Sequence, residues 1–289
     1  MKRIILFLFM SVCVSCNDVR LPDPSVRLVV EAWAEDNGRP VVIVTTVVPV
    51  SSEYQELSGL QDHIARWAKV TISDGTEKTV LSGRVNRNHF PPYVYTKDTY
   101  RILPDKEYSI SVEYGGEKAT SSVRVPHCKP LDFIRVEAVP GKADAYRLVA
   151  GISDYSEEVD RYKFFVRREK KDSSYMSSFL GYVSDESFAS SQAEVAIYNG
   201  MNLMSEEFEQ YFTGSDHVHV KFCVLDDVTW QYWSDYEDLT SLSRNPFFPV
   251  TSAIRSNISG GLGYFSGYGA SYYEVSIPDS IAVSAVRVP

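Results

Sequence analysis

The sequence has little positive charge for its length of 289 residues: 29 lysines and arginines stand against 38 aspartates and glutamates. The formal net charge is −9 and no basic stripe offsets it, so phosphate backbones would repel the chain. Nucleic acid is therefore not expected as a partner. The hydrophobic share of 44% and the charged share of 23% argue against wholesale disorder and against a polytopic membrane protein.

Cysteine is also scarce, and the four cysteines of the chain are of two kinds. Cys13 and Cys16 belong to an N-terminal apolar segment, so the mature part of the protein retains only Cys128 and Cys223. In an oxidising compartment these two thiols could form a disulfide. Sequence alone does not show whether their Cα atoms come close enough for one.

Signatures of catalysis are missing, since neither H-E-x-x-H nor G-x-S-x-G occurs in the chain. His217 and His219 lie two residues apart, so a strand would place both imidazoles on one face. A zinc site needs a third ligand, which the spacing does not supply, and Lys221 on the same face would repel a cation. We interpret the two histidines as polar surface residues and expect no metal, no cofactor and no catalytic residue.

The N-terminus has the layout of a cleaved bacterial signal. Two positive residues precede an apolar run, Ile4 to Met10, that is too short to cross a bilayer. Val14-Ser15-Cys16 resembles a lipobox, in which small residues precede the cysteine that is acylated. We predict a signal peptide over residues 1–16, lipidation at its last residue and a tether over residues 17–25. Acyl chains would then anchor the mature protein to a membrane without a spanning segment.

Short strand patterns separated by turn signals run through the rest of the chain, which is 13% aromatic. Asp74-Gly75 and Gly115-Gly116 each separate two alternating segments, which predicts two β-hairpins. Acidic, aromatic segments at 205–212 and 229–242 predict short helices. We predict an all-β protein of two β-sandwich-like domains, immunoglobulin-like or fibronectin-like, with short helical insertions in the second.

The boundary between the two predicted domains is placed at Pro126, which ends one strand pattern before another begins near Cys128. The N-terminal β-sandwich domain would span residues 26–126, and the C-terminal β-rich domain residues 127–289. In the second, Gly260 to Tyr273 alternates glycines with aromatic residues. This pattern favours tightly packed strands at a sheet corner over a phosphate-binding loop.

The most suggestive cluster for ligand binding is aromatic. Trp230 and Trp233 share one face at helical spacing, while Tyr232 and Tyr236 share another. Exposed rings can stack on a sugar or clamp a peptide, so Trp230, Trp233 and Tyr236 are the candidate ligand-binding residues. The alternative is that these rings pack a short helix onto the sandwich.

Three segments carry a resemblance to a known family: Leu28-Val29-Val30-Glu31-Ala32-Trp33, Val70-Thr71-Ile72-Ser73-Asp74-Gly75 and Asn257-Ile258-Ser259-Gly260-Gly261-Leu262-Gly263-Tyr264-Phe265. Together they resemble a Bacteroidetes lipoprotein family of unknown function, often encoded beside TonB-dependent outer-membrane receptors. The resemblance implies an outer-membrane accessory protein in nutrient uptake, with such a receptor as its partner. It implies no defined ligand or catalytic residue.

Three function classes follow for the chain. The first is a non-catalytic accessory lipoprotein that binds a ligand or partner at the outer membrane. The second is a surface glycan or peptide hydrolase with two carboxylates about 5–9.5 Å apart, and the third is a structural spacer. An aromatic-lined pocket would favour the first, a carboxylate-lined cleft the second, and neither feature the third. We expect the first.

Overall fold

The secondary structure is mostly β in the computed structural model, which describes residues 27–47, 61–153, 159–201, 209–243 and 254–278. Among these residues one α-helix, α2 (Asp227–Ser243), accompanies the strands, together with short 3-10 turns at residues 61–63 and at η2 (Asp185–Ser187). The predicted all-β fold class is confirmed. The predicted helix at 229–242 is α2. Of the helix predicted at 205–212, residues 205–208 lie outside the described residues, and residues 209–212 are not helical because Phe212 forms a β-bridge with Tyr146.

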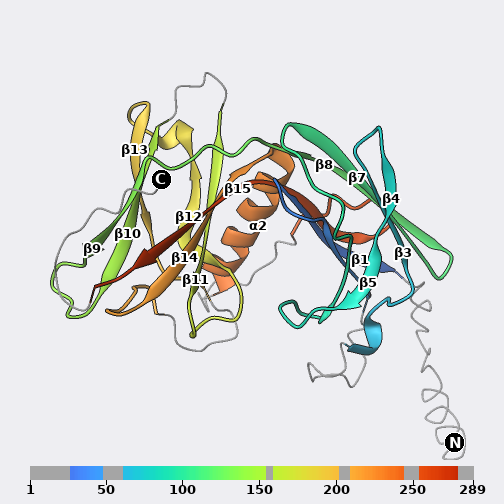
Figure 1. Ribbon diagram of the computed structural model, residues 1–289, viewed down its shortest axis with the longest axis horizontal. Helices are drawn as coiled ribbons and strands as arrows, with labels where there is room; N and C mark the ends of the chain where they lie inside the picture. Colours follow the sequence, from blue (N-terminus) through green and yellow to red (C-terminus); the bar gives the residue numbers. More distant parts are fainter. Residues whose placement is uncertain (1–26, 48–60, 154–158, 202–208, 244–253, 279–289) are drawn as a thin grey trace, which may run out of the picture.

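The largest sheet contains eight strands from both ends of the chain. They are β1 (Leu28–Glu35), β2 (Val41–Thr46), β5 (Ser82–Val85), β6 (Tyr93–Thr96), β11 (Arg161–Arg168), β12 (Met176–Ser184), β14 (His217–Leu225) and β15 (Leu262–Ser276). Their order across the sheet is β12-β11-β14-β15-β1-β2-β6-β5 (Figure 1).

Two smaller sheets complete the described part of the fold. The strands of the first are β3 (Lys69–Ser73), β4 (Lys78–Val80), β7 (Lys106–Tyr114) and β8 (Glu117–Val125), in the order β4-β3-β7-β8. The strands of the second are β9 (Phe133–Ala138), β10 (Tyr146–Ser153) and β13 (Gln192–Ile197), in the order β13-β10-β9.

Each smaller sheet packs against the large one and encloses a separate hydrophobic core. In the first half of the molecule, buried residues of β1 such as Val30 meet residues of β7 such as Val112. In the second half, Phe222 of β14 lies in one core with Leu148 of β10. The two halves are thus β-sandwiches, and the large sheet runs through both.

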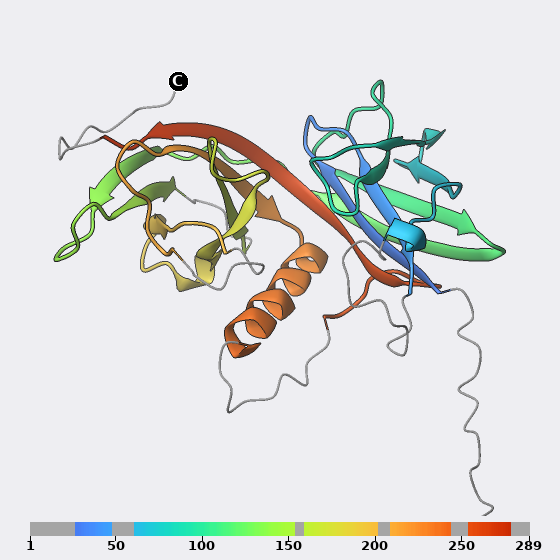
Figure 2. The same ribbon diagram turned by 90° about the horizontal axis from the view of Figure 1, so that it is seen from below.

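Strand β15 joins the two halves. It pairs with β1 in parallel from Val29↔Leu262 to Glu35↔Tyr268, and with β14 antiparallel from there to His217↔Ser276. Figure 2 shows it as one long curved strand through both halves. Pro126 therefore marks the passage from the first core to the second, but Ile258 and Phe265 return to the first core.

Side chains alternate along strands, so the large sheet has a second face opposite the two cores. Helix α2 lies on this face (Figure 2), where Trp233 packs with Phe165 and Tyr268. The helix begins after Asp226, whose carboxylate accepts a hydrogen bond of 2.8 Å from the backbone N–H of Thr229, as an N-cap residue does. Because α2 covers only part of this face, the rest is open.

Candidate ligand-binding cleft

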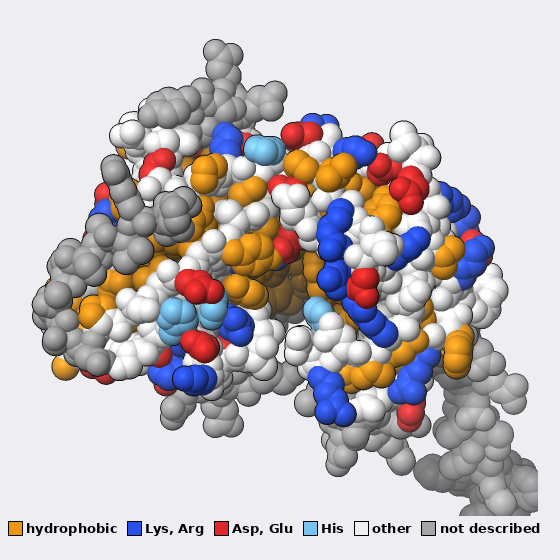
Figure 3. Space-filling model, viewed as in Figure 1, with side chains coloured by type: hydrophobic (Ala, Val, Ile, Leu, Met, Phe, Trp, Pro, Cys, Tyr) orange, Lys and Arg blue, Asp and Glu red, His pale blue; other side chains and the backbone are white. Residues whose placement is uncertain are grey.

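The part of the large sheet that α2 leaves open is the floor of a cleft between the two halves of the molecule. The cleft has a volume of about 590 Å³, its floor comes from β1, β2, β11, β14 and β15, and segments 88–90 and 173–175 complete its walls. Figure 3 shows the hollow at the middle of the molecule, with hydrophobic side chains gathered along it. Concave, partly apolar cavities of this size are typical of small-molecule sites.

Aromatic rings line the cleft from both halves. Trp33 on β1 lies 5.3 Å from His89, and Phe165 on β11 lies edge-on to Tyr268 at 6.1 Å, measured between ring centroids. Burial lowers the pKa of His89, so its imidazole is neutral at neutral pH and both donates and accepts hydrogen bonds. Such a wall can stack on a flat ligand and bind its polar edge.

A buried ion pair lies in the cleft floor. The ammonium group of Lys221 on β14 contacts the carboxylate of Glu35 on β1, and both side chains are only 13% exposed. The hydroxyl of Tyr272 also donates to Glu35. Burial acts to lower the pKa of Lys221, whereas Cys223 and Glu35 act to raise it, and the net pKa lies above its ordinary value. Lys221 is therefore a fixed cation whose charge is compensated within the protein.

Glu31 is the second carboxylate of the cleft. Burial raises its pKa above the ordinary value, and a 3.2 Å hydrogen bond from the Tyr264 hydroxyl partly opposes this shift. The Tyr264 ring stacks on Tyr232 of α2, with 3.7 Å between the ring centroids. This stacking fixes the hydroxyl that contacts Glu31. The cleft thus offers one carboxyl group that is more easily protonated than a surface glutamate.

The sequence matches a family described as Domain of unknown function (DUF4249) over residues 17–274, which is most of the chain. The chain belongs to the DUF4249 family. Among curated proteins no sequence matches it. The resemblance to an uncharacterised family is confirmed, while the Bacteroidetes and lipoprotein context stays a prediction.

In this DUF4249 chain the predicted ligand-binding residues lie between α2 and the large sheet. Trp233 is 8% exposed, and its indole N–H donates to the hydroxyl of Tyr268 at 3.0 Å. Trp230 stacks on Tyr182 at 3.5 Å, and Tyr236 lies edge-on to Trp233 at 5.1 Å. The three residues are close together, but they are not among the residues that line the cleft. Their rings pack α2 onto the large sheet, as in the alternative interpretation of the sequence.

Sequence reasoning did not select the residues that do line the cleft. Glu31 and Trp33 come from β1 and Lys221 comes from β14, and only the long-range pairing of both strands with β15 brings them together. A local signal was present in β1, where small apolar residues alternate with Glu31 and Trp33. A glutamate and a tryptophan on the outward face of a strand indicate a covered or functional surface.

Cys128 and Cys223 are free thiols, so the disulfide that the sequence left open is absent. The reason is that β15 lies between them. Cys223 pairs with Ala270 and packs on the α2 side with Trp233, whereas Cys128 lies at the opposite face, close to Gly269 and hydrogen-bonded to Ser271. Burial raises the pKa of both thiols, which keeps them protonated and unreactive at neutral pH.

The predicted signal peptide, the lipidation site Cys16 and the tether at residues 17–25 lie outside the described residues. Among the residues that the structure describes, no helix combines the length and the apolar character needed to cross a membrane.

Proposed function

We propose that this protein is a lipoprotein anchored to the outer membrane, that it binds a small ligand in the cleft between its two sandwiches, and that it supports TonB-dependent nutrient uptake. The lipobox at Cys16 and the family resemblance support the location. The family match begins at residue 17, directly after the predicted lipidated cysteine. Residues 1–16 are thus separate from the domain itself.

The binding proposal rests on one observation: the aromatic side chains of the cleft wall lie beside the ion pair of Lys221 and Glu35, whose charges cancel. Trp33 and Phe165 line the cleft from the two halves, and Lys221 is compensated by Glu35. A ligand entering such a site meets apolar surface, hydrogen-bonding groups and the guanidinium of Arg167, which lies over the Tyr175 ring, but no uncompensated lysine charge. This lining suits an uncharged molecule with a flat face and polar edges, such as a sugar or a peptide segment.

Binding is favoured over hydrolysis because, among the described residues, a single carboxylate, Glu31, lines the cleft. A glycan hydrolase needs one carboxyl group as acid and a second as base or nucleophile. Glu35, beneath the lining, is held by Lys221 and Tyr272. Glu31 remains as a single carboxyl group with a raised pKa.

The cleft is tested by native mass spectrometry of the full chain in detergent, incubated with panels of neutral oligosaccharides and short peptides. We expect one panel to give a bound species that Trp33→Ala weakens at least about tenfold. Trp67→Ala is the matched control, because Trp67 is 90% exposed and lies outside the cleft. Equal retention by the two variants, or no binding by the wild type, would refute the cleft as the ligand site.

The uptake role is tested separately by affinity purification of the lipidated protein from native membranes, followed by mass spectrometry of the proteins that copurify. A TonB-dependent receptor in stoichiometric amount is the expected result. A Cys16→Ser variant is the control for membrane attachment, since it lacks the acylated thiol. Recovery of no receptor with the wild type would contradict a stable uptake complex and leave the spacer alternative.

A further inference from the structure

We propose that the protein binds a transition-metal ion, with zinc as the best fit, through Glu169, His217, His219 and Glu274. The four residues lie beside the cleft, on the same face of the large sheet as Lys221. In Figure 3 histidine and acidic side chains gather near the central hollow. The site is independent of the ligand proposed for the cleft.

Glu169, His217 and His219 converge at this site, and Glu274 lies against both histidines. Ligand atoms of Glu169, His217 and His219 all lie within 4.8 Å of one another. A carboxylate oxygen of Glu274 lies 3.4 Å from Nδ1 of His219, and the other lies 3.7 Å from Nε2 of His217. Tetrahedral zinc with bonds of about 2.0–2.1 Å separates its ligand atoms by about 3.4 Å. The contacts between Glu274 and the two histidines are near this spacing, and Glu169 lies within 4.8 Å of both histidines.

The donor set selects a class of metal. Two imidazole nitrogens with two carboxylate oxygens suit zinc and its neighbours cobalt, nickel and copper, whereas calcium and magnesium prefer oxygen ligands alone. The hydroxyl of Ser276 lies 2.9 Å from Nδ1 of His217. This hydrogen bond orients the ring and leaves Nε2 for the metal, as second-shell partners of metal-binding histidines do.

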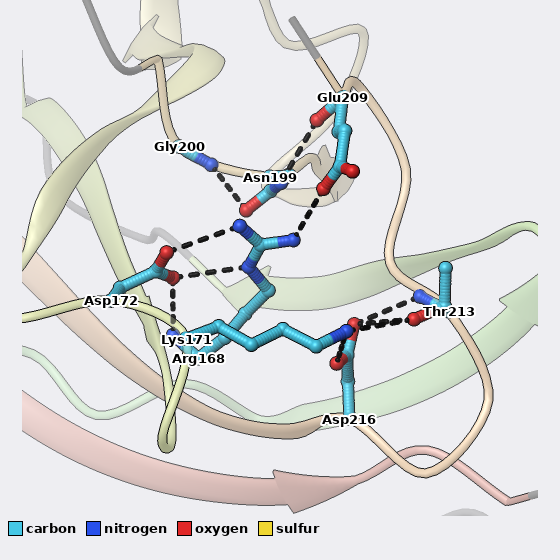
Figure 4. Close-up of polar contacts among 8 residues, drawn as sticks. All are labelled: Arg168, Lys171, Asp172, Asn199, Gly200, Glu209, Thr213 and Asp216. Atoms are coloured by element: carbon cyan, nitrogen blue, oxygen red, sulfur yellow. Dashed lines mark hydrogen bonds and ion pairs between the residues drawn. The ribbon is translucent and has the colours of Figure 1, made fainter. Parts of the chain in front are cut away.

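A network of ion pairs holds the backbone that carries two of the ligands (Figure 4). Arg168 donates to both oxygens of Asp172 within the turn after β11, at 3.1 Å each. Lys171 in the same turn pairs at 2.7 Å with Asp216, the residue before His217. The backbone N–H of Glu169 also donates to the carbonyl of His217 at 2.8 Å. The turn and the start of β14 are thus fixed together, which preorganises the site.

The sequence spacing alone offered no third ligand, and it placed Lys221 on the same face, where its charge would repel a cation. The structure supplies Glu169 and Glu274 from neighbouring strand regions, and their two negative charges balance a divalent ion. Lys221 is neutralised by Glu35. Arg167, which pairs with His219 across the strands, directs its guanidinium to the ring of Tyr175, 5.6 Å from its centroid.

Zinc binding to the full chain is measured by competition with a chromophoric chelator, and cobalt binding by visible absorption. We expect one equivalent of zinc, and at least about tenfold weaker binding for His219→Ala and for Glu274→Gln. His127→Ala is the matched control, because His127 is exposed and lies outside the cluster. Circular dichroism checks that each variant is folded.

The cobalt spectrum distinguishes a built site from loose association, since tetrahedral coordination gives intense visible bands that His219→Ala should abolish. Acidification should release the metal as the imidazoles take up protons. The proposal is wrong if the wild type takes up no zinc, or if His219→Ala and Glu274→Gln bind it as tightly as His127→Ala does. None of these readouts depends on the cleft ligand, so the two proposals fail independently.

Discussion

Two lysines on the second face of the large sheet are buried, and each is paired with a glutamate. Lys163 has no exposed side-chain surface and contacts Glu237 beneath α2, whereas Lys221 contacts Glu35 in the cleft floor. Burial lowers the pKa of Lys163 despite its partner, while the pKa of Lys221 is raised. Removing either glutamate would leave a buried positive charge, which destabilises proteins by about 3–5 kcal/mol.

Substitution of Glu31 is predicted to increase the stability of the protein, in contrast to removal of Glu35 or Glu237. Its folded pKa is raised by burial above 4.5, so the folded state loses stability relative to the unfolded chain as the pH rises above that value. Glu31→Gln removes the ionisation and should increase the free energy of unfolding by on the order of 1 kcal/mol near pH 7.5. Near pH 4 the gain should disappear, because both states of the wild type are protonated there.

The measurement is urea unfolding of both proteins at the two pH values, with Glu35→Gln as the control variant. That control breaks the pair with Lys221 and should lower stability near neutral pH. A Glu31→Gln protein that is less stable than the wild type near pH 7.5 would show that burial does not dominate at this carboxyl group.

At the scale of the elements, sequence reasoning located hairpins well. Gly115 and Gly116 adopt φ of +59° and +86°, as expected for a tight turn between β7 and β8. Sequence reasoning could not place β15 beside β1. That pairing is parallel, joins residues from opposite ends of the chain and has no local turn signal. The cleft depends on this pairing, so its lining was not predicted.

The contact between α2 and the sheet gives a prediction at the same scale. Trp233 is 8% exposed and packs edge-on to Phe165 at 5.1 Å. Trp233→Ala should reduce the free energy of unfolding by about 3–5 kcal/mol, the cost of a large cavity in a core. Trp67→Ala, at a site that is 90% exposed, should change it by less than about 0.5 kcal/mol. Equal effects in urea unfolding would mean that α2 does not rest on Trp233.

At the scale of the whole molecule, one sheet serves two cores. Phe265 of β15 belongs to the first core and Tyr273 of the same strand to the second. Between them β8 crosses so close that a Cβ atom at Gly267 would lie 2.2 Å from the carbonyl oxygen of Arg124. Glycine is required where two backbones approach this closely. The junction of the halves is therefore packed backbone against backbone.

This junction predicts that the two sandwiches unfold as one unit. Gly267→Ala forces β8 away from β15 and should destabilise the protein by roughly 1–3 kcal/mol. Because β15 runs through both cores, hydrogen exchange should become faster in β7 of the first half and in β10 of the second by the same factor.

Gly75→Ala is the control, since no atom lies within 4 Å of its Cβ position and its turn belongs to the first half alone. The added methyl group at position 75 contacts no other atom, so the only cost is the backbone strain of a positive φ. If Gly267→Ala accelerated exchange in one half and left the other unchanged, the halves would be separate folding units. Equal acceleration would mean that the cleft between them is held open by a single cooperative scaffold, because its floor includes β15, the strand that both cores share.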